Sequence, residues 1–123
     1  MILRIDDNKS ISDLQEKFEL CFPGLKIEFY RKPHNWYEAT SSKYLYPSES
    51  LIGDIRKIHD RGELEIKSWF KTGKVEQDFK EGFGLYVQVF RYKNNKWVQT
   101  TLCDNLTLAQ LVGNVFESKS AVK

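Results

Sequence analysis

Hydrophobic positions recur along the chain with two different periods. In segments 14–22 and 75–83 they lie three or four residues apart, which places them on one face of a helix. In segments 25–30 and 85–92 they alternate with polar or aromatic positions, as in a strand with one buried face. The pattern therefore predicts, twice along the chain, a helix followed directly by a strand.

The alternation also assigns each strand residue to a face of the sheet. The residues predicted to point inward are Leu25, Ile27, Phe29, Leu85, Val87 and Val89. The residues predicted to point outward are Lys26, Glu28, Tyr30, Tyr86, Gln88, Phe90 and Tyr92. Several aromatic side chains thus fall on the face that would normally be polar.

Polar residues mark where the predicted helices begin. Ser12 followed by Gln15, and Thr107 followed by Gln110, fit a capping box, in which two side chains satisfy free backbone N–H groups. Thr72 is the predicted N-cap of the helix between them. The sequence therefore predicts helix starts at these three places.

Glycine and asparagine mark the predicted turns. Gly24 and Gly84 stand where each helix ends and the backbone must turn through a left-handed conformation. The pair Asn94–Asn95 predicts a two-residue hairpin, because Asn tolerates a positive φ. This hairpin would place Tyr92 opposite Trp97 on one face of the sheet.

The two halves of the chain match each other at an offset of about 60 residues. Matched positions include Leu3 with Leu64, Ile27 with Val87, Arg31 with Arg91, Trp36 with Trp97, and Ser50–Leu51 with Thr107–Leu108. We therefore expect two tandem β-α-β-β-α repeats, 1–61 and 62–117, in one compact pseudo-symmetric domain, followed by a frayed tail at 118–123.

The order of these elements is the ferredoxin-like order, and it predicts an α+β fold. The sheet should be mainly antiparallel, with the helices packed on one face. One six-stranded sheet and two three-stranded sheets both fit the pattern.

Composition limits the possible functions. The chain has 123 residues, with 19 Lys+Arg against 17 Asp+Glu, a balance too close to neutral to indicate nucleic-acid binding by itself. No apolar run approaches the roughly 20 residues that cross a bilayer, and Met1–Asp7 leaves no room for the apolar part of a signal peptide. We therefore expect a cytoplasmic protein with reduced cysteines and no membrane partner.

Few residues are candidates for catalysis. The helical spacing places Cys21 on a buried face, where a small core residue is the usual interpretation. Cys103, in a predicted loop, is a candidate catalytic thiol, and His34 and His59, near predicted loops, are each a candidate general base. The sequence has no phosphate-binding, dinucleotide or metalloprotease motif, so neither enzymatic activity nor a cofactor or metal is expected.

The unusual feature is the aromatic content, which is 14% of the chain. The candidate binding residues are Tyr86, Phe90, Arg91, Tyr92, Lys93, Trp97, Arg31 and Trp36. Three interpretations remain open for the outward aromatics. They are core covered by the other repeat or a helix, they are covered by a second copy of the chain in a homodimer, or they bind a partner, including single-stranded nucleic acid, by stacking beside cations.

One part of the sequence resembles a known family. The runs Gly84–Arg91 and Trp97–Thr101, with Asp104 and Leu106–Leu108, resemble the C-terminal half of a small family of uncharacterised bacterial proteins found chiefly in Bacteroidetes-type genomes. Where this chain has Leu106, the family often has Trp. The resemblance implies a small bacterial protein, and it transfers no activity, ligand or site residue.

The function predicted from the sequence is a non-catalytic binding or assembly domain that uses a sheet face or the cleft between the repeats. Single-stranded nucleic-acid binding is the first alternative, and an enzyme using Cys103 or His34 is the second. Trp97 is predicted to anchor the second hairpin, since Trp36 occupies the matching position in the first half.

Overall fold

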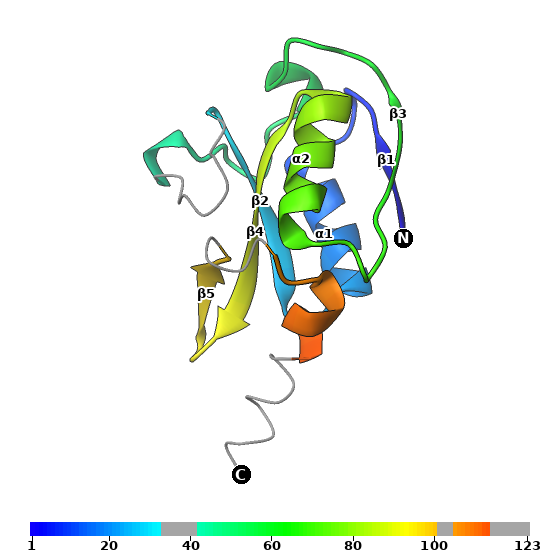
Figure 1. Ribbon diagram of the computed structural model, residues 1–123. Helices are drawn as coiled ribbons and strands as arrows, with labels where there is room; N and C mark the ends of the chain where they lie inside the picture. Colours follow the sequence, from blue (N-terminus) through cyan, green and yellow to red (C-terminus); the bar gives the residue numbers. More distant parts are fainter. Residues whose placement is uncertain (33–41, 101–104, 114–123) are drawn as a thin grey trace.

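The computed structural model describes residues 1–32, 42–100 and 105–113 (Figure 1). The strands are β1 (Ile2–Ile5), β2 (Leu25–Tyr30), β3 (Gly62–Glu65), β4 (Tyr86–Lys93) and β5 (Lys96–Gln99). The α-helices are α1 (Ile11–Cys21) and α2 (Thr72–Phe83), and residues 108–113 are also helical. Short 3₁₀ turns lie at Ser42–Tyr44 and Ile52–Asp54.

The fold is α+β with antiparallel sheets. Strand β1 pairs with β3, and a separate sheet has the order β2-β4-β5. Helices α1 and α2 each contact both sheets and lie between them (Figure 1). The described strands thus form a two-stranded and a three-stranded sheet, rather than one six-stranded or two three-stranded sheets. The strand expected after β2 falls largely on residues 33–41, outside the described residues.

The core lies between the helices and the two sheets. Phe29 of β2 meets Phe79 of α2 edge to face, with ring centroids 6.0 Å apart. Leu3 and Ile5 of β1 are fully buried against the same core. Burial of this kind stabilises a domain by about 25 cal/mol for each Å² of apolar surface removed from water.

The predicted inward faces of β2 and β4 are confirmed, but two residues predicted to point outward are buried. Leu25, Ile27, Phe29, Leu85, Val87 and Val89 are all buried. Tyr30 is buried as well, because Leu45 and Tyr46 continue the sheet beside the end of β2. Gln88 is 0% exposed, although it belongs to the face turned away from the helices.

The N-cap of helix α1 lies two residues earlier in the chain than predicted. Ser10, not Ser12, is the N-cap, and it forms the capping box with Asp13. Gln15 instead donates to the carbonyl of Ile27 at 2.7 Å, so its amide connects α1 to β2. This contact between distant segments has no local signal in the sequence.

The two later helix starts give one correction and one confirmation. Lys71 is the N-cap of α2, and the Thr72 hydroxyl donates to the carbonyl of Leu106 at 2.9 Å. The capping box of Thr107 and Gln110 is confirmed by reciprocal hydrogen bonds of 2.8 and 3.1 Å.

The prediction that Cys21 is buried is wrong. Cys21 is exposed, and the apolar stripe of α1 continues from Phe18 to Phe22, whose rings are 5.1 Å apart. Four residues advance about one helical turn, so Phe22 stays on the face of Phe18 while Cys21 is rotated away from it.

The predicted turns are confirmed. Gly24 and Gly84 have φ values of 86° and 65°, and Asn94 and Asn95 have 53° and 64°. The hairpin places Tyr92 opposite Trp97, as expected from its two-residue loop.

Each half of the chain closes with the same pair of backbone hydrogen bonds. In the first half Ile11 N–H donates to Ser50 and Ile52 N–H donates to Lys9; the second half has the corresponding bonds Thr72 to Leu106 and Leu108 to Phe70. These bonds give Ser50 and Leu106 equivalent places, one residue away from the match of Ser50 with Thr107 expected from the sequence. The helix expected at the end of the first half is only a 3₁₀ turn.

Candidate functional site

The candidate site is a group of side chains at the hairpin end of the three-stranded sheet, on the face turned away from the helices. We call it the aromatic–lysine cluster and define it as Lys26, Phe90, Tyr92 and Trp97. The antiparallel register brings these residues together, because Lys26 pairs with Phe90 and Tyr92 pairs with Trp97. Three of the four residues were predicted from the sequence as binding residues.

Lys26 lies over two of the aromatic rings. Its ammonium is 4.8 Å from the ring centroid of Trp97 and 5.4 Å from that of Phe90. The carboxylate of Glu28 lies 3.4 Å from the same ammonium. The Lys26 side chain is 22% exposed, so these contacts lie between the about 0.5–1 kcal/mol of exposed cation–π pairs and the about 2 kcal/mol of desolvated ones.

Tyr92 and Trp97 form the open side of the cluster. Their rings are 5.3 Å apart at 65°, and Trp97 remains 38% exposed. Together with Glu19 and Gly24 they line a shallow hollow of about 340 Å³. The ring of Trp97 is therefore both packed and accessible to a partner.

Basic residues surround this end of the sheet. Lys93 and Lys96 are exposed and opposite each other at the hairpin tip. Arg91 is half-buried, and its Nε has no hydrogen-bond partner among the described residues. Tyr86, another predicted binding residue, is half-buried and pairs with Tyr30 at the opposite end of β4.

Arg31 does not join the cluster. It follows the end of β2, donates to the carbonyl of Leu45 at 3.0 Å and lies 4.5 Å from the ring centroid of Tyr46. Arg91 pairs with Leu25 at the start of β2. Six residues of strand separate the two ends, which corresponds to roughly 20 Å, so the two arginines do not line one cleft. Trp36 lies outside the described residues.

A second basic group lies beyond the end of β2. Lys32 is hydrogen-bonded to the hydroxyl of Tyr44 at 3.3 Å, and Lys43 lies 5.0 Å from the same ring. The hydrogen bonds from Lys32 and Lys43 lower the pKa of Tyr44. Positive charge is thus present near both ends of β2.

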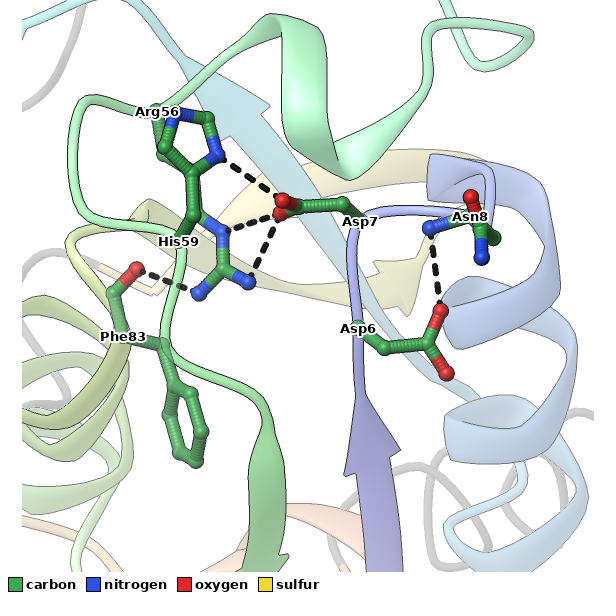
Figure 2. A network of polar contacts seen from close by, with 6 residues as sticks. All are labelled: Asp6, Asp7, Asn8, Arg56, His59 and Phe83. Atoms are coloured by element: carbon green, nitrogen blue, oxygen red, sulfur yellow. Dashed lines mark hydrogen bonds and ion pairs between the residues drawn. The ribbon is translucent and has the colours of Figure 1, made fainter.

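A separate cluster of polar side chains joins Asp7, which follows β1, to Arg56 and His59, which follow the second 3₁₀ turn (Figure 2). Arg56 donates from Nε and Nη2 to Asp7 Oδ1 at 3.0 and 2.9 Å, and from Nη1 to the carbonyl of Phe83 at 3.2 Å. His59 Nδ1 lies 2.8 Å from Asp7 Oδ2. Burial opposes ionisation of Asp7, but the hydrogen bonds and charges of Arg56 and His59 outweigh it and lower its pKa.

The contacts of this second cluster link separate segments of the fold. The Arg56 side chain is 0% exposed, and its charge lies against the C-terminal carbonyl of α2, where a cation is favoured. A histidine–carboxylate pair can act as a base, but among the described residues His59 has no hydrogen bond to a serine, threonine or cysteine. The cluster therefore connects β1, the 56–59 segment and α2.

The remaining catalytic candidates cannot be placed. Cys103 and His34 lie outside the described residues, as does the tail 118–123. Within the part of the chain that is described, no group of three or more His, Cys, Asp or Glu side chains could hold a metal ion. No helix among those residues is long and apolar enough to cross a membrane.

Comparisons with protein-family models, with curated proteins and with solved structures find no match for this chain. The resemblance to a bacterial family therefore stays a prediction.

Sequence reasoning did not identify Lys26 and Arg56 as important. Lys26 is recognisable only when the pairing of β2 with β4 is known, because its aromatic partners are more than 60 residues away. Arg56 has no local pattern at all, since Asp7 is 49 residues distant.

Proposed function

We propose that the chain is a non-catalytic binding domain whose ligand surface is the aromatic–lysine cluster. The observation that carries this proposal is Trp97, which packs on Tyr92 and Lys26 yet keeps 38% of its surface exposed beside a hollow. Exposed aromatic residues next to cations are typical of binding surfaces. In the polar cluster around Asp7, by contrast, the guanidinium of Arg56 is fully buried.

A fluorotryptophan-labelled protein provides a direct test. Its ¹⁹F spectrum reports separately on Trp97 and Trp69, once each signal is assigned with a Trp→Phe variant. We would add a single-stranded oligothymidylate, polyglutamate and heparin in turn, and separately raise the protein concentration. At least one titration should move the Trp97 signal and leave Trp69 unchanged. If no titration moves the Trp97 signal, the proposal is wrong.

We also propose that the two halves, 1–61 and 62–117, are copies related by a pseudo-two-fold axis. Two strand pairings support this. Leu3 and Leu64 match in the sequence at an offset of 61 and are directly opposite each other in the β1–β3 ladder. The offset of 60 that matches Ile27 with Val87 also matches Glu28 with Gln88, and these two are opposite each other in the β2–β4 ladder.

Residues related by a two-fold axis face each other only where the axis passes between them. Both pairings therefore fit one axis that crosses the two sheets, and the matching backbone hydrogen bonds at Ser50 and Leu106 add independent support. Because strands pair across the halves, fragments 1–61 and 62–117 should be unfolded alone and should regain secondary structure when mixed. Independent folding of either fragment by circular dichroism would contradict this proposal.

A further inference from the structure

We infer that the partner of the aromatic–lysine cluster is a second copy of this chain, which pairs with β5 edge to edge. This inference depends on the proposed binding function and names its partner. It follows from the backbone groups of Trp97, from the covered opposite edge of the sheet and from the residues that self-pairing would bring together.

The backbone of Trp97 points away from β4, to the outer edge of the three-stranded sheet. Thr100 N–H donates to the Val89 carbonyl at 3.1 Å, and an antiparallel strand bonds to its neighbour at every second residue. Val98 and Lys96 therefore also bond to β4, whereas the N–H and C=O of Trp97 are directed to the other side. Among the described residues, none forms a hydrogen bond with these two groups. An edge of this kind is a template for another strand.

The opposite edge of this sheet, along β2, is partly covered by the chain itself. The Phe29 carbonyl accepts a hydrogen bond from Tyr46 N–H at 2.9 Å, and the Ile27 carbonyl accepts one from Gln15 Nε2 at 2.7 Å. A sheet that is open at both edges can add copies without end, whereas one open edge favours a closed pair. A closed pair of identical chains joins the same edge of each copy around a two-fold axis.

The residues of β5 suit pairing with their own counterparts. Segment 97–99 contains no charged residue and no proline, which commonly protect an edge strand from pairing. In an antiparallel register centred on Trp97, this residue exchanges two backbone hydrogen bonds with its counterpart. The two Trp97 rings then lie side by side on one face, as in stabilising cross-strand aromatic pairs. Lys96 falls opposite Val98 of the second copy, so no two lysines are directly opposite each other.

The pairing would join the three-stranded sheets of two copies into one continuous sheet. Trp97 is 38% exposed in the single chain, and the second copy would cover part of this surface. The contact is a short pair of strands, and interfaces that bury less than about 1,200 Å² are usually weak and transient. We therefore expect a dimer that forms and dissociates as the protein concentration changes.

The chain contains a matched control for this site. Trp69 is 65% exposed, and the Lys67 ammonium lies 4.9 Å from its ring centroid, which is nearly the 4.8 Å of Lys26 on Trp97. Trp69 lies outside the three-stranded sheet. A substitution at Trp69 therefore changes an equivalent Lys–Trp contact without altering β5.

The experiment is sedimentation velocity of the full chain from about 10 μM to about 1 mM, a range suited to weak interfaces. The sedimentation coefficient should rise with concentration toward that of a dimer. Added salt should not weaken the association, because it screens only the repulsion between lysines of the two copies. A sedimentation coefficient that stays at the monomer value throughout would overturn the inference.

Charge at Trp97 tests the position of the contact. Trp97→Glu removes the aromatic pair and puts like charges opposite each other, so it should reduce the association constant about tenfold or more. Trp69→Glu should associate like the parent. Equal association by Trp97→Glu and the parent would place the contact elsewhere on the chain and overturn the inference.

A mixture of two variants protects the test from misfolding of either one. Trp97→Glu and Trp97→Lys should each associate poorly alone but should associate with each other, because the register puts glutamate opposite lysine. Trp97→Phe keeps an aromatic pair and should dimerise like the parent. A mixture that associates no better than its components would overturn the inference.

Other probes of Trp97 separate the inference from the proposed function. If oligothymidylate, polyglutamate or heparin moves the Trp97 ¹⁹F signal while protein concentration does not, the binding function stands and the second copy is excluded as the partner. If nothing moves that signal, both proposals fall. A Trp97 signal that moves with concentration, together with slower hydrogen exchange of the Trp97 backbone amide, is the result we expect.

Discussion

Arg56 is the residue whose removal should most clearly reveal how the polar cluster stabilises the fold. Its side chain is fully buried and makes three hydrogen bonds, two to Asp7 and one to the carbonyl of Phe83. Arg56→Met keeps an apolar stem in the same space and removes all three bonds. The change therefore reports on the polar contacts rather than on packing.

The expected loss follows from the environment of each partner. Breaking a buried ion pair costs about 3–5 kcal/mol. Here the side chain of Asp7 is 37% exposed, so water can hydrate the carboxylate that Arg56 leaves behind. The Phe83 carbonyl loses its donor in a buried position, which costs about 1–3 kcal/mol. Together these considerations place the loss for Arg56→Met at about 2–3 kcal/mol.

Urea denaturation followed by circular dichroism measures this loss. With a slope of about 1–3 kcal/mol per molar urea for a small domain, the midpoint should fall by about 1–2 M. Lys57→Met, on the exposed neighbouring residue, is the control and should change stability by less than about 0.5 kcal/mol. If Arg56→Met unfolds like this control, the contacts of Arg56 do not stabilise the fold.

The pH dependence has a definite sign. Although burial opposes ionisation of Asp7, its contacts with Arg56 and His59 hold its pKa below the usual value, so the folded state binds fewer protons than the unfolded state. The stability from this group is fully present above the unfolded pKa of about 4 and is lost as the pH falls through the folded pKa. The parent should therefore lose stability below about pH 4 more steeply than Asp7→Asn does. Parallel acid profiles for the two proteins would contradict this.

Three further predictions concern single positions. Ser10→Ala removes the N-cap of α1 and should cost about 1 kcal/mol in urea unfolding; no loss would contradict the capping box. Gly84→Ala should cost about 1–2 kcal/mol, because alanine is strained at a φ of 65°. The added Cβ would meet no clash, since its nearest neighbour, on Ile58, is 3.7 Å away. Unchanged stability would contradict the backbone strain. Burial, aided by the charge of Glu28, raises the pKa of Tyr30 to about 12. Stability from Tyr30 should therefore be present below pH 10 and be lost toward pH 12, and a tyrosinate absorbance titration of Tyr30→Phe should lack this late transition.

The parts of the fold that the sequence predicted correctly depend on local physics. The left-handed turns at Gly24 and Asn94–Asn95 and the cap at Thr107 involve residues within a few positions of each other. The alternation in β2 and β4 correctly identified the face that packs on the helices. Periodicity and turn chemistry are sufficient for such features.

The parts that the sequence did not predict depend on pairing between distant segments. The division into two sheets follows from which strands pair, and the hydrophobic pattern of a strand does not name its partner. Alternation predicted that Gln88 points away from the helices, but its side chain is buried. Alternation predicts which face of the sheet a residue lies on, whereas its exposure depends on what packs against that face. In the candidate site, the aromatic residues were predictable from alternation and the hairpin, whereas Lys26 required the β2–β4 register.

Trp97 is both a contact within the β4–β5 hairpin and an exposed part of the proposed binding surface, and the stability of Trp97→Ala tests both roles. A fully buried Trp or Phe costs about 3–5 kcal/mol when cut back to Ala. Trp97 is 38% exposed, so part of that burial is missing, but it keeps an aromatic contact with Tyr92 worth about 0.5–1.5 kcal/mol. We therefore expect Trp97→Ala to cost about 1.5–2.5 kcal/mol, clearly less than Phe29→Ala in the core.

Urea midpoints of Trp97→Ala and Phe29→Ala, measured side by side, distinguish the possible roles of Trp97. Equal losses would mean that the Trp97 ring is core in solution, and the binding surface proposed around it would not be accessible. A loss below about 0.5 kcal/mol would mean that Trp97 does not anchor the hairpin. An intermediate loss is expected for a residue that holds β4 and β5 together and still keeps part of its ring exposed.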